Sequence, residues 1–150
     1  MISKDVTLHP AVHLTGDIVP CSRPKVTSKG IAYYPAKYRN WKKAAAAELS
    51  LQWKQQPIQG ALEVEITVLS TRPKNKMRKK TENVRIPRFK ARGDLDNQLK
   101  SILDVLQESK IIENDSQIYS INIKSYYTKK DEKPITEIKI LECCNVVWRI

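Results

Sequence analysis

A short acidic cluster with one lysine has the residue types best suited to chemistry. Asp94, Asp96 and Lys100 stand at the start of a segment with helical periodicity, and Asp115 follows where that segment ends. Mg²⁺ takes oxygen ligands in near-octahedral geometry and usually keeps several waters, so a few carboxylates from separate segments suit it. Bound metal polarises a phosphate and helps to generate hydroxide from water. The cluster therefore predicts metal-dependent cleavage of nucleic acid, with Lys100 stabilising the developing negative charge.

A strongly basic segment directly precedes the cluster. Between Thr71 and Arg92 there are ten Lys or Arg and one acid, which places +9 of the formal net charge of +11 within 22 residues. Charge this localised favours a polyanionic partner, although a solvated, mobile loop has the same composition. We expect salt-dependent phosphate contacts with DNA from a subset of twelve bases. These are Arg23, Lys25, Arg72, Lys74, Lys76, Arg78, Lys79, Lys80, Arg85, Arg88, Lys90 and Arg92.

Simpler roles are open for the same acids. Aspartate is a good N-cap, so Asp94 and Asp96 are also consistent with starting the helix, and Asp115 with a turn. Asp104 lies about one turn past Lys100 and is expected to pair with it or to be solvated, rather than to bind metal. Four aromatic residues are able to stack on bases, but packing roles are expected for them. They are Tyr33, Tyr34, Trp41 and Trp53.

Composition predicts one folded domain of the chain's 150 residues, since 41% hydrophobic residues suffice for a core. The three cysteines are odd in number and form no CxxC pattern, so we expect reduced thiols in a cytoplasmic protein. The absence of an HExxH motif argues against a zinc site. No apolar run approaches the length of a membrane span, and the N-terminus has no signal-peptide hydrophobic region.

The elements that must position the cluster form an α+β pattern, with a mixed β-sheet and two main α-helices. Strands are predicted at residues 12–19, 31–34, 62–69, 118–127 and 136–141. Helices are predicted at residues 35–55, which contain four consecutive alanines, and from 94–96 to about 109. On a helical wheel of the second helix, the following side chains share the face expected to pack on the core. They are Leu95, Leu99, Ile102, Leu103 and Leu106.

The order Asp94-Leu95-Asp96-Asn97, then Lys100, then Asp115-Ser116-Gln117, resembles the RusA family of Holliday junction resolvases. The Ser22-Arg23-Pro24-Lys25 element is similar to that family's opening, and Arg72-Pro73-Lys74 is similar to the segment after its central strand. The resemblance covers residues 18–141, which is most of the chain, and rests on this combination rather than on the paired aspartates alone.

The resemblance implies a homodimeric endonuclease that resolves four-way DNA junctions by paired symmetric nicks, using Mg²⁺ or Mn²⁺, in recombination and repair. Such enzymes are bacterial and often encoded by phages or prophages. It implies metal binding by Asp94, Asp96 and Asp115, and a catalytic role for these residues and Lys100. Some members carry aromatic residues immediately before the first aspartate, thought to wedge the junction open. Here residues 91–93 are Ala, Arg and Gly, so junction distortion is expected to depend on other groups.

Two rival functions fit the residues taken alone. One is a non-catalytic, basic DNA-binding module in which the acids are structural. The other is a metal-dependent nuclease that acts on flaps or on RNA. Calorimetry with Mg²⁺ or Mn²⁺ separates the module from a nuclease, because the module has no metal site for Asp94→Asn to remove. A two-fold dimer matches a substrate that needs two cuts, since it presents two sites.

Overall fold

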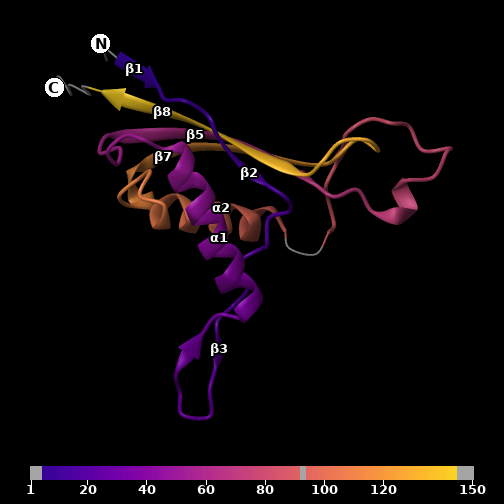
Figure 1. Ribbon diagram of the computed structural model, residues 1–150, viewed down its shortest axis with the longest axis horizontal. Coiled ribbons are helices and arrows are strands. Elements are labelled where there is room, and N and C mark those ends of the chain that lie inside the picture. Colours follow the sequence, from indigo (N-terminus) through magenta and orange to yellow (C-terminus); the bar gives the residue numbers. More distant parts are fainter. Residues whose placement is uncertain (1–4, 92–93, 145–150) are drawn as a thin grey trace.

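A mixed six-stranded β-sheet carries two α-helices on one face (Figure 1). The structure, a computed structural model, describes residues 5–91 and 94–144. The sheet contains β1 (Asp5–Leu8), β2 (Val12–Thr15), β5 (Ala61–Ser70), β6 (Ile86–Pro87), β7 (Ile118–Tyr127) and β8 (Ile135–Cys144). The helices are α1 (Ala36–Gln52) and α2 (Leu95–Glu108), and the shorter 3-10 turns are η1 (Lys74–Lys76) and η2 (Asp115–Gln117). The predicted α+β class, mixed sheet and two main helices are confirmed.

Two neighbouring strands of the sheet are parallel, and the connection between them contains α2. The strands follow one another in the order β1-β8-β5-β7-β6, and β2 also pairs with β8. β5 and β7 are parallel neighbours, whereas the other pairs are antiparallel. Parallel neighbours need a crossover connection, and here it consists of the basic segment followed by α2. The connection therefore places the start of α2 directly after the basic segment.

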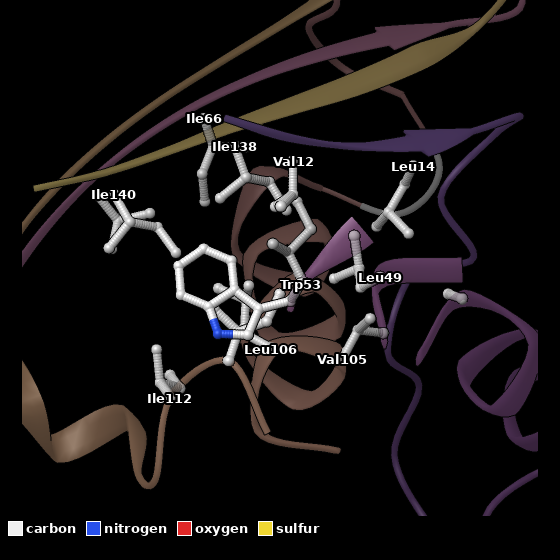
Figure 2. Close-up of a cluster of buried hydrophobic side chains, with 14 of the residues drawn as sticks. Val12, Leu14, Leu49, Trp53, Ile66, Val105, Leu106, Ile112, Ile138 and Ile140 are labelled. Atoms are coloured by element: carbon white, nitrogen blue, oxygen red, sulfur yellow. The ribbon is translucent and has the colours of Figure 1, made fainter. Parts of the chain in front are cut away.

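The core lies between the sheet and the two helices. β5 alternates as predicted, with Leu62, Val64, Ile66 and Val68 all buried. Trp53, which follows α1, is surrounded by apolar side chains from β2, β5, β8 and α2 (Figure 2). The expected packing role of this tryptophan is therefore confirmed. Within the described ranges, no helix is long and apolar enough to cross a membrane.

The buried face of α2 differs from the predicted leucine stripe. Ile102 and Leu106 are fully buried as expected, but Leu95 is 42% exposed, and Leu99 and Leu103 are only partly buried. Four of the five predicted side chains therefore pack on the core and Leu95 does not, while two polar residues of the helix also face inward. Hydrogen bonding permits this burial of polar residues, because a polar side chain is accommodated in a core when it has a partner.

Both inward-facing polar residues of α2 have such partners. Gln98 is 1% exposed, and the Ser125 hydroxyl of β7 donates a hydrogen bond to its Oε1 at 2.9 Å. Ser101 is fully buried, and its hydroxyl donates to the carbonyl of Val19 at 2.7 Å. These bonds fix α2 in rotation against β7 on one side and against the chain leading out of β2 on the other.

The basic loop, defined here as residues 71–91, is built around a buried arginine. Arg72 is 5% exposed, and its guanidinium donates to four backbone carbonyls at 2.7–3.2 Å. Three of these carbonyls belong to the loop itself, at Lys76, Glu82 and Val84, and the fourth belongs to Thr128. Arg72 thus holds the backbone of the loop together. Its prediction as a phosphate contact was wrong.

An ion pair ties the same loop to the connection between β7 and β8. Arg85 bonds both carboxylate oxygens of Glu132, with the shortest contact at 2.7 Å. The hydrogen bonds from Arg85 and from the Lys129 backbone lower the pKa of Glu132 from 4.5 to about 2. The same pairing raises the pKa of Arg85. Lys130 adds a bond from its Nζ to the carbonyl of Arg78 at 2.9 Å.

Replacing Arg72 tests whether it organises the basic loop. We expect Arg72→Met to lower the free energy of unfolding by about 2–4 kcal/mol, because it leaves buried carbonyls without donors. Amide hydrogen exchange should accelerate across residues 71–91 in particular. Arg78→Met is the matched control, since Arg78 is an exposed arginine of the same loop. Equal exchange rates in the two variants would show that the Arg72 bonds do not hold the loop.

The Arg85–Glu132 pair predicts a defined pH dependence. A carboxylate with a lowered folded-state pKa stabilises the fold above its unfolded pKa, and the effect is lost as pH falls through the folded pKa. At pH 7 we expect the free energy of unfolding of the wild-type protein to exceed that of Glu132→Gln by about 1 kcal/mol. The difference is small because a partly exposed ion pair is screened by solvent. Urea unfolding should show this gap closing between pH 4.5 and about 2. A gap that stays constant over that range would contradict the assignment.

Candidate active site

A cleft opens where α2 begins and the chain of residues 21–24 runs beside it. The cleft has a volume of about 560 Å³. It brings Asp94, Asp96 and Lys100 together with the Ser22-Arg23-Pro24 element, although 69 residues separate the two segments in sequence. The remaining lining residues are Cys21, Tyr34, Asn97 and Asp104.

Backbone and side-chain bonds hold the two walls of the cleft together. The backbone N–H of Cys21 donates to the carbonyl of Asn97 at 3.2 Å. One turn further along α2, the Ser101 hydroxyl holds the carbonyl of Val19. The segment carrying Ser22 and Arg23 is therefore fixed against the first two turns of α2. Cys21 is a free thiol, as is Cys143, in agreement with the expectation of reduced cysteines; the Cys144 side chain lies outside the described residues.

The acids at the start of α2 are exposed to the cleft and to solvent. Asp94 is the N-cap, and its Oδ1 accepts a hydrogen bond from the Asn97 N–H at 3.2 Å. Asp96 and Lys100 lie one turn apart, with 72% and 62% of their side chains exposed and 3.8 Å between the carboxylate and the ammonium. Capping is thus a real role of Asp94, but it uses one carboxylate oxygen. Such exposed carboxylates stay accessible to a cation.

Asp104 has a partner that the sequence did not reveal. The hydroxyl of Tyr38, a residue of α1 that is 1% exposed, donates a short hydrogen bond to Asp104 Oδ2. This overturns the expected pairing of Asp104 with Lys100. Burial and the hydrogen bond to Asp104 both raise the pKa of Tyr38 far above its ordinary value, so the phenol remains a donor at neutral pH. The pair connects α1 to α2 at the wall of the cleft. Nothing in the spacing of these residues signals the contact.

Asp115 lies at the opposite end of α2 from the other acids. Its backbone N–H donates to Oε1 of Gln107, near the C-terminus of the helix, at 3.3 Å. Since an α-helix rises 1.5 Å per residue, Asp94 and Gln107 are roughly 20 Å apart along its axis. A single chain therefore does not bring Asp115 beside Asp94 and Asp96. Across residues 5–91 and 94–144, no three His, Cys, Asp or Glu side chains are grouped closely enough to hold one ion.

The donor set of the cleft nevertheless fits a hard divalent cation. Asp94, Asp96, Asn97 and Ser22, whose side chains all carry oxygen atoms, line the same space. Mg²⁺ prefers such oxygen ligands and is usually held by one or two carboxylates with several waters. Two carboxylates from one chain supply part of a metal site, and a third acid from elsewhere would strengthen it.

The predicted phosphate contacts differ in how exposed they are. Arg23 and Lys25 near the cleft are exposed. Within the basic loop, Arg85 is engaged by Glu132, and Lys76 and Arg88 are partly buried. Arg92 lies outside the described residues. The exposed cations of the loop that carry no such ion pair with an acid are Lys74, Arg78, Lys79, Lys80 and Lys90.

Comparison with known proteins identifies the family of the chain. A family model described as "Endodeoxyribonuclease RusA" matches residues 15–141. A relative from Aquifex aeolicus (strain VF5), named "Crossover junction endodeoxyribonuclease RusA", is 29% identical over 122 residues, which cover 81% of this chain and 83% of the relative. The cleft acids, Lys100 and the basic loop all lie inside the matched region. The chain belongs to the RusA family of endodeoxyribonucleases, enzymes that hydrolyse phosphodiester bonds.

Proposed function

We propose that this chain is a single-domain subunit of a homodimeric, Mg²⁺-dependent endonuclease that cuts four-way DNA junctions by paired nicks in recombination and repair. The observation that carries the proposal is the cleft in which two exposed aspartates and Lys100 meet Arg23. The basic loop leads directly into this cleft and supplies charge for the DNA backbone. The name of the Aquifex aeolicus relative, a crossover junction enzyme, supports the choice of substrate.

The residues of the cleft divide the work of phosphodiester hydrolysis. Asp94 and Asp96 would hold the Mg²⁺, which when bound supplies Lewis-acid activation of the phosphate and of water. Lys100 is one turn into the helix, so its ammonium reaches the phosphate from beside the two carboxylates. There it stabilises the negative charge that develops during attack. Arg23 on the facing wall adds a second positive charge that orients the DNA backbone.

The position of Asp115 supports a dimer in which two chains share each site. If two copies pack with their α2 helices antiparallel about a two-fold axis, Asp115 of the partner subunit lies near Asp94 and Asp96. Apolar surface suited to such packing is present: Leu95 of α2 is 42% exposed and Ile121 of the neighbouring β7 is 39% exposed. A two-fold dimer of this kind carries two complete sites, as paired cleavage requires.

A cleavage assay tests the proposed function. Purified protein is incubated with a labelled four-way junction and with a linear duplex of the same sequence, in Mg²⁺ and in chelator. We expect symmetric nicks in the junction only, and none in chelator. Asp96→Asn should reduce the cleavage rate at least about a hundredfold, because it removes charge from the metal site, while junction binding is retained.

Glu65→Gln is the matched control, since Glu65 is an exposed acid on β5 and lies outside the cleft. Cleavage by Asp96→Asn at the normal rate would show that Asp96 is not a metal ligand. Tight junction binding by the wild type without cleavage in Mg²⁺ or Mn²⁺ would favour the non-catalytic module. A labelled flap and a labelled RNA are tested alongside the junction and the duplex, and preferential cleavage of either would favour the other rival nuclease.

Mixing two inactive variants tests whether the sites are shared. Asp96→Asn and Asp115→Asn are each expected to be inactive as homodimers. In a mixed dimer with shared sites, one site carries both substitutions and the other carries neither, so activity returns. Random exchange of subunits gives half of the dimers one intact site, measured as single nicks in the junction. Sites contained within one chain would give no recovery, and that result would exclude the shared arrangement.

A further inference from the structure

A small hairpin projects from the edge of the cleft. It consists of β3 (Lys25–Val26) and β4 (Ala32–Tyr33), and Figure 1 shows it extending beyond α1, away from the sheet. Every residue from 22 to 33 is exposed. The hairpin begins and ends at cleft residues, since Pro24 and Tyr34 line the cleft on either side of it.

The hairpin has a defined turn rather than a loose loop. The Thr27 N–H donates to the Ile31 carbonyl at 2.9 Å, and the Gly30 N–H donates to the Thr27 carbonyl at 2.9 Å. The Thr27 hydroxyl also accepts from the Ile31 N–H at 3.1 Å. Gly30 has φ +79°, the left-handed conformation that closes a three-residue hairpin loop and that glycine adopts without strain. The backbone of the hairpin therefore has a defined conformation.

The surface of the hairpin combines positive charge with exposed apolar groups. Residues 18–47 contain seven Lys or Arg and no acid, and Lys25 and Lys29 belong to the hairpin itself. Val26 is 66% exposed, Ile31 61% and Tyr33 42%. Lysines account for binding to phosphates, but apolar side chains gain nothing from a solvated phosphate backbone. Base faces are the apolar surface of DNA, and proteins reach them with aliphatic wedges and aromatic stacking.

We propose that the β3–β4 hairpin inserts Val26, Ile31 and Tyr33 against base faces at the branch point, and so discriminates junctions from linear duplex. The inference rests on the proposed junction cleavage and adds a recognition element to it. In a linear duplex neighbouring base pairs cover each other's faces. At a four-way branch point the stack is interrupted next to the phosphates to be cut. The hairpin starts at the cleft wall, so it meets that interruption when a phosphate lies in the cleft.

The test is a triple variant, Val26→Thr, Ile31→Thr and Tyr33→Thr, which keeps strand-forming side chains and every lysine. Leu8→Thr is the matched control, because Leu8 is a strand residue that is 66% exposed and lies in β1, away from the cleft. Affinities for the junction and for a linear duplex are measured in chelator over a range of salt concentrations. A 2-aminopurine base at the branch point reports unstacking by its fluorescence.

We expect the triple variant to bind the junction about tenfold or more weakly, with duplex affinity changed by less than threefold. The dependence of affinity on salt should not change, since the phosphate contacts remain. The 2-aminopurine signal should fall to that of free junction. The melting temperature should match that of Leu8→Thr, because the three side chains have no contacts in the core.

Three outcomes would overturn the inference. Unchanged junction affinity and fluorescence would show that the hairpin does not touch bases. Loss of the dimer in sedimentation equilibrium would show that the hairpin is a subunit interface. A lower melting temperature would show that it packs within the protein. Failure of the proposed function is distinguishable, because then the wild-type protein itself would show neither junction preference nor metal-dependent cleavage.

Discussion

The rotation of α2 about its own axis determines the geometry of the site. Gln98 and Ser101 face the core, where an unpaired polar side chain is costly, and each is held by a hydrogen bond. One partner is on β7 and the other is the chain that forms the facing wall of the cleft. Any other rotation of α2 would break both bonds. The observed rotation of α2 exposes Asp96 and Lys100, and it leaves Leu95 at the surface.

The same helix acts as a rigid spacer between parts of the proposed metal site. Because α2 is continuous from Leu95 to Glu108, no adjustment of side chains within one chain brings Asp115 to Asp94. Under the proposed dimer, the length of the helix makes catalysis depend on assembly, since a lone subunit holds two carboxylates of the three. Cleavage is then confined to the symmetric form of the protein. That form is also the one able to place two cuts in one junction.

The sequence predicted those parts of the fold that depend on neighbouring residues. The alternation in β5, the alanine-rich α1 and the Asp94 cap are all local patterns, and all are confirmed. The helical wheel of α2 placed four of its five apolar residues on the core correctly, but it did not predict that Gln98 and Ser101 face the core as well. Gln98 and Ser101 find their partners 27 and 82 residues away in sequence, which no local pattern contains. Tyr38 and Asp104 are 66 residues apart and were missed for the same reason.

Charge composition likewise predicted the character of the basic loop but not its internal structure. Arg72 was indistinguishable in sequence from its neighbours, because burial of its guanidinium depends on how the loop folds back to present its own carbonyls and on the carbonyl of Thr128. With Arg72 and the Arg85–Glu132 pair inside it, the loop presents its remaining cations from an ordered backbone. A preorganised loop loses less conformational entropy on binding a polyanion. Under the proposed function, the ordered loop would supply affinity for phosphates, and the hairpin beside the cleft would add the proposed contacts with bases at the branch point.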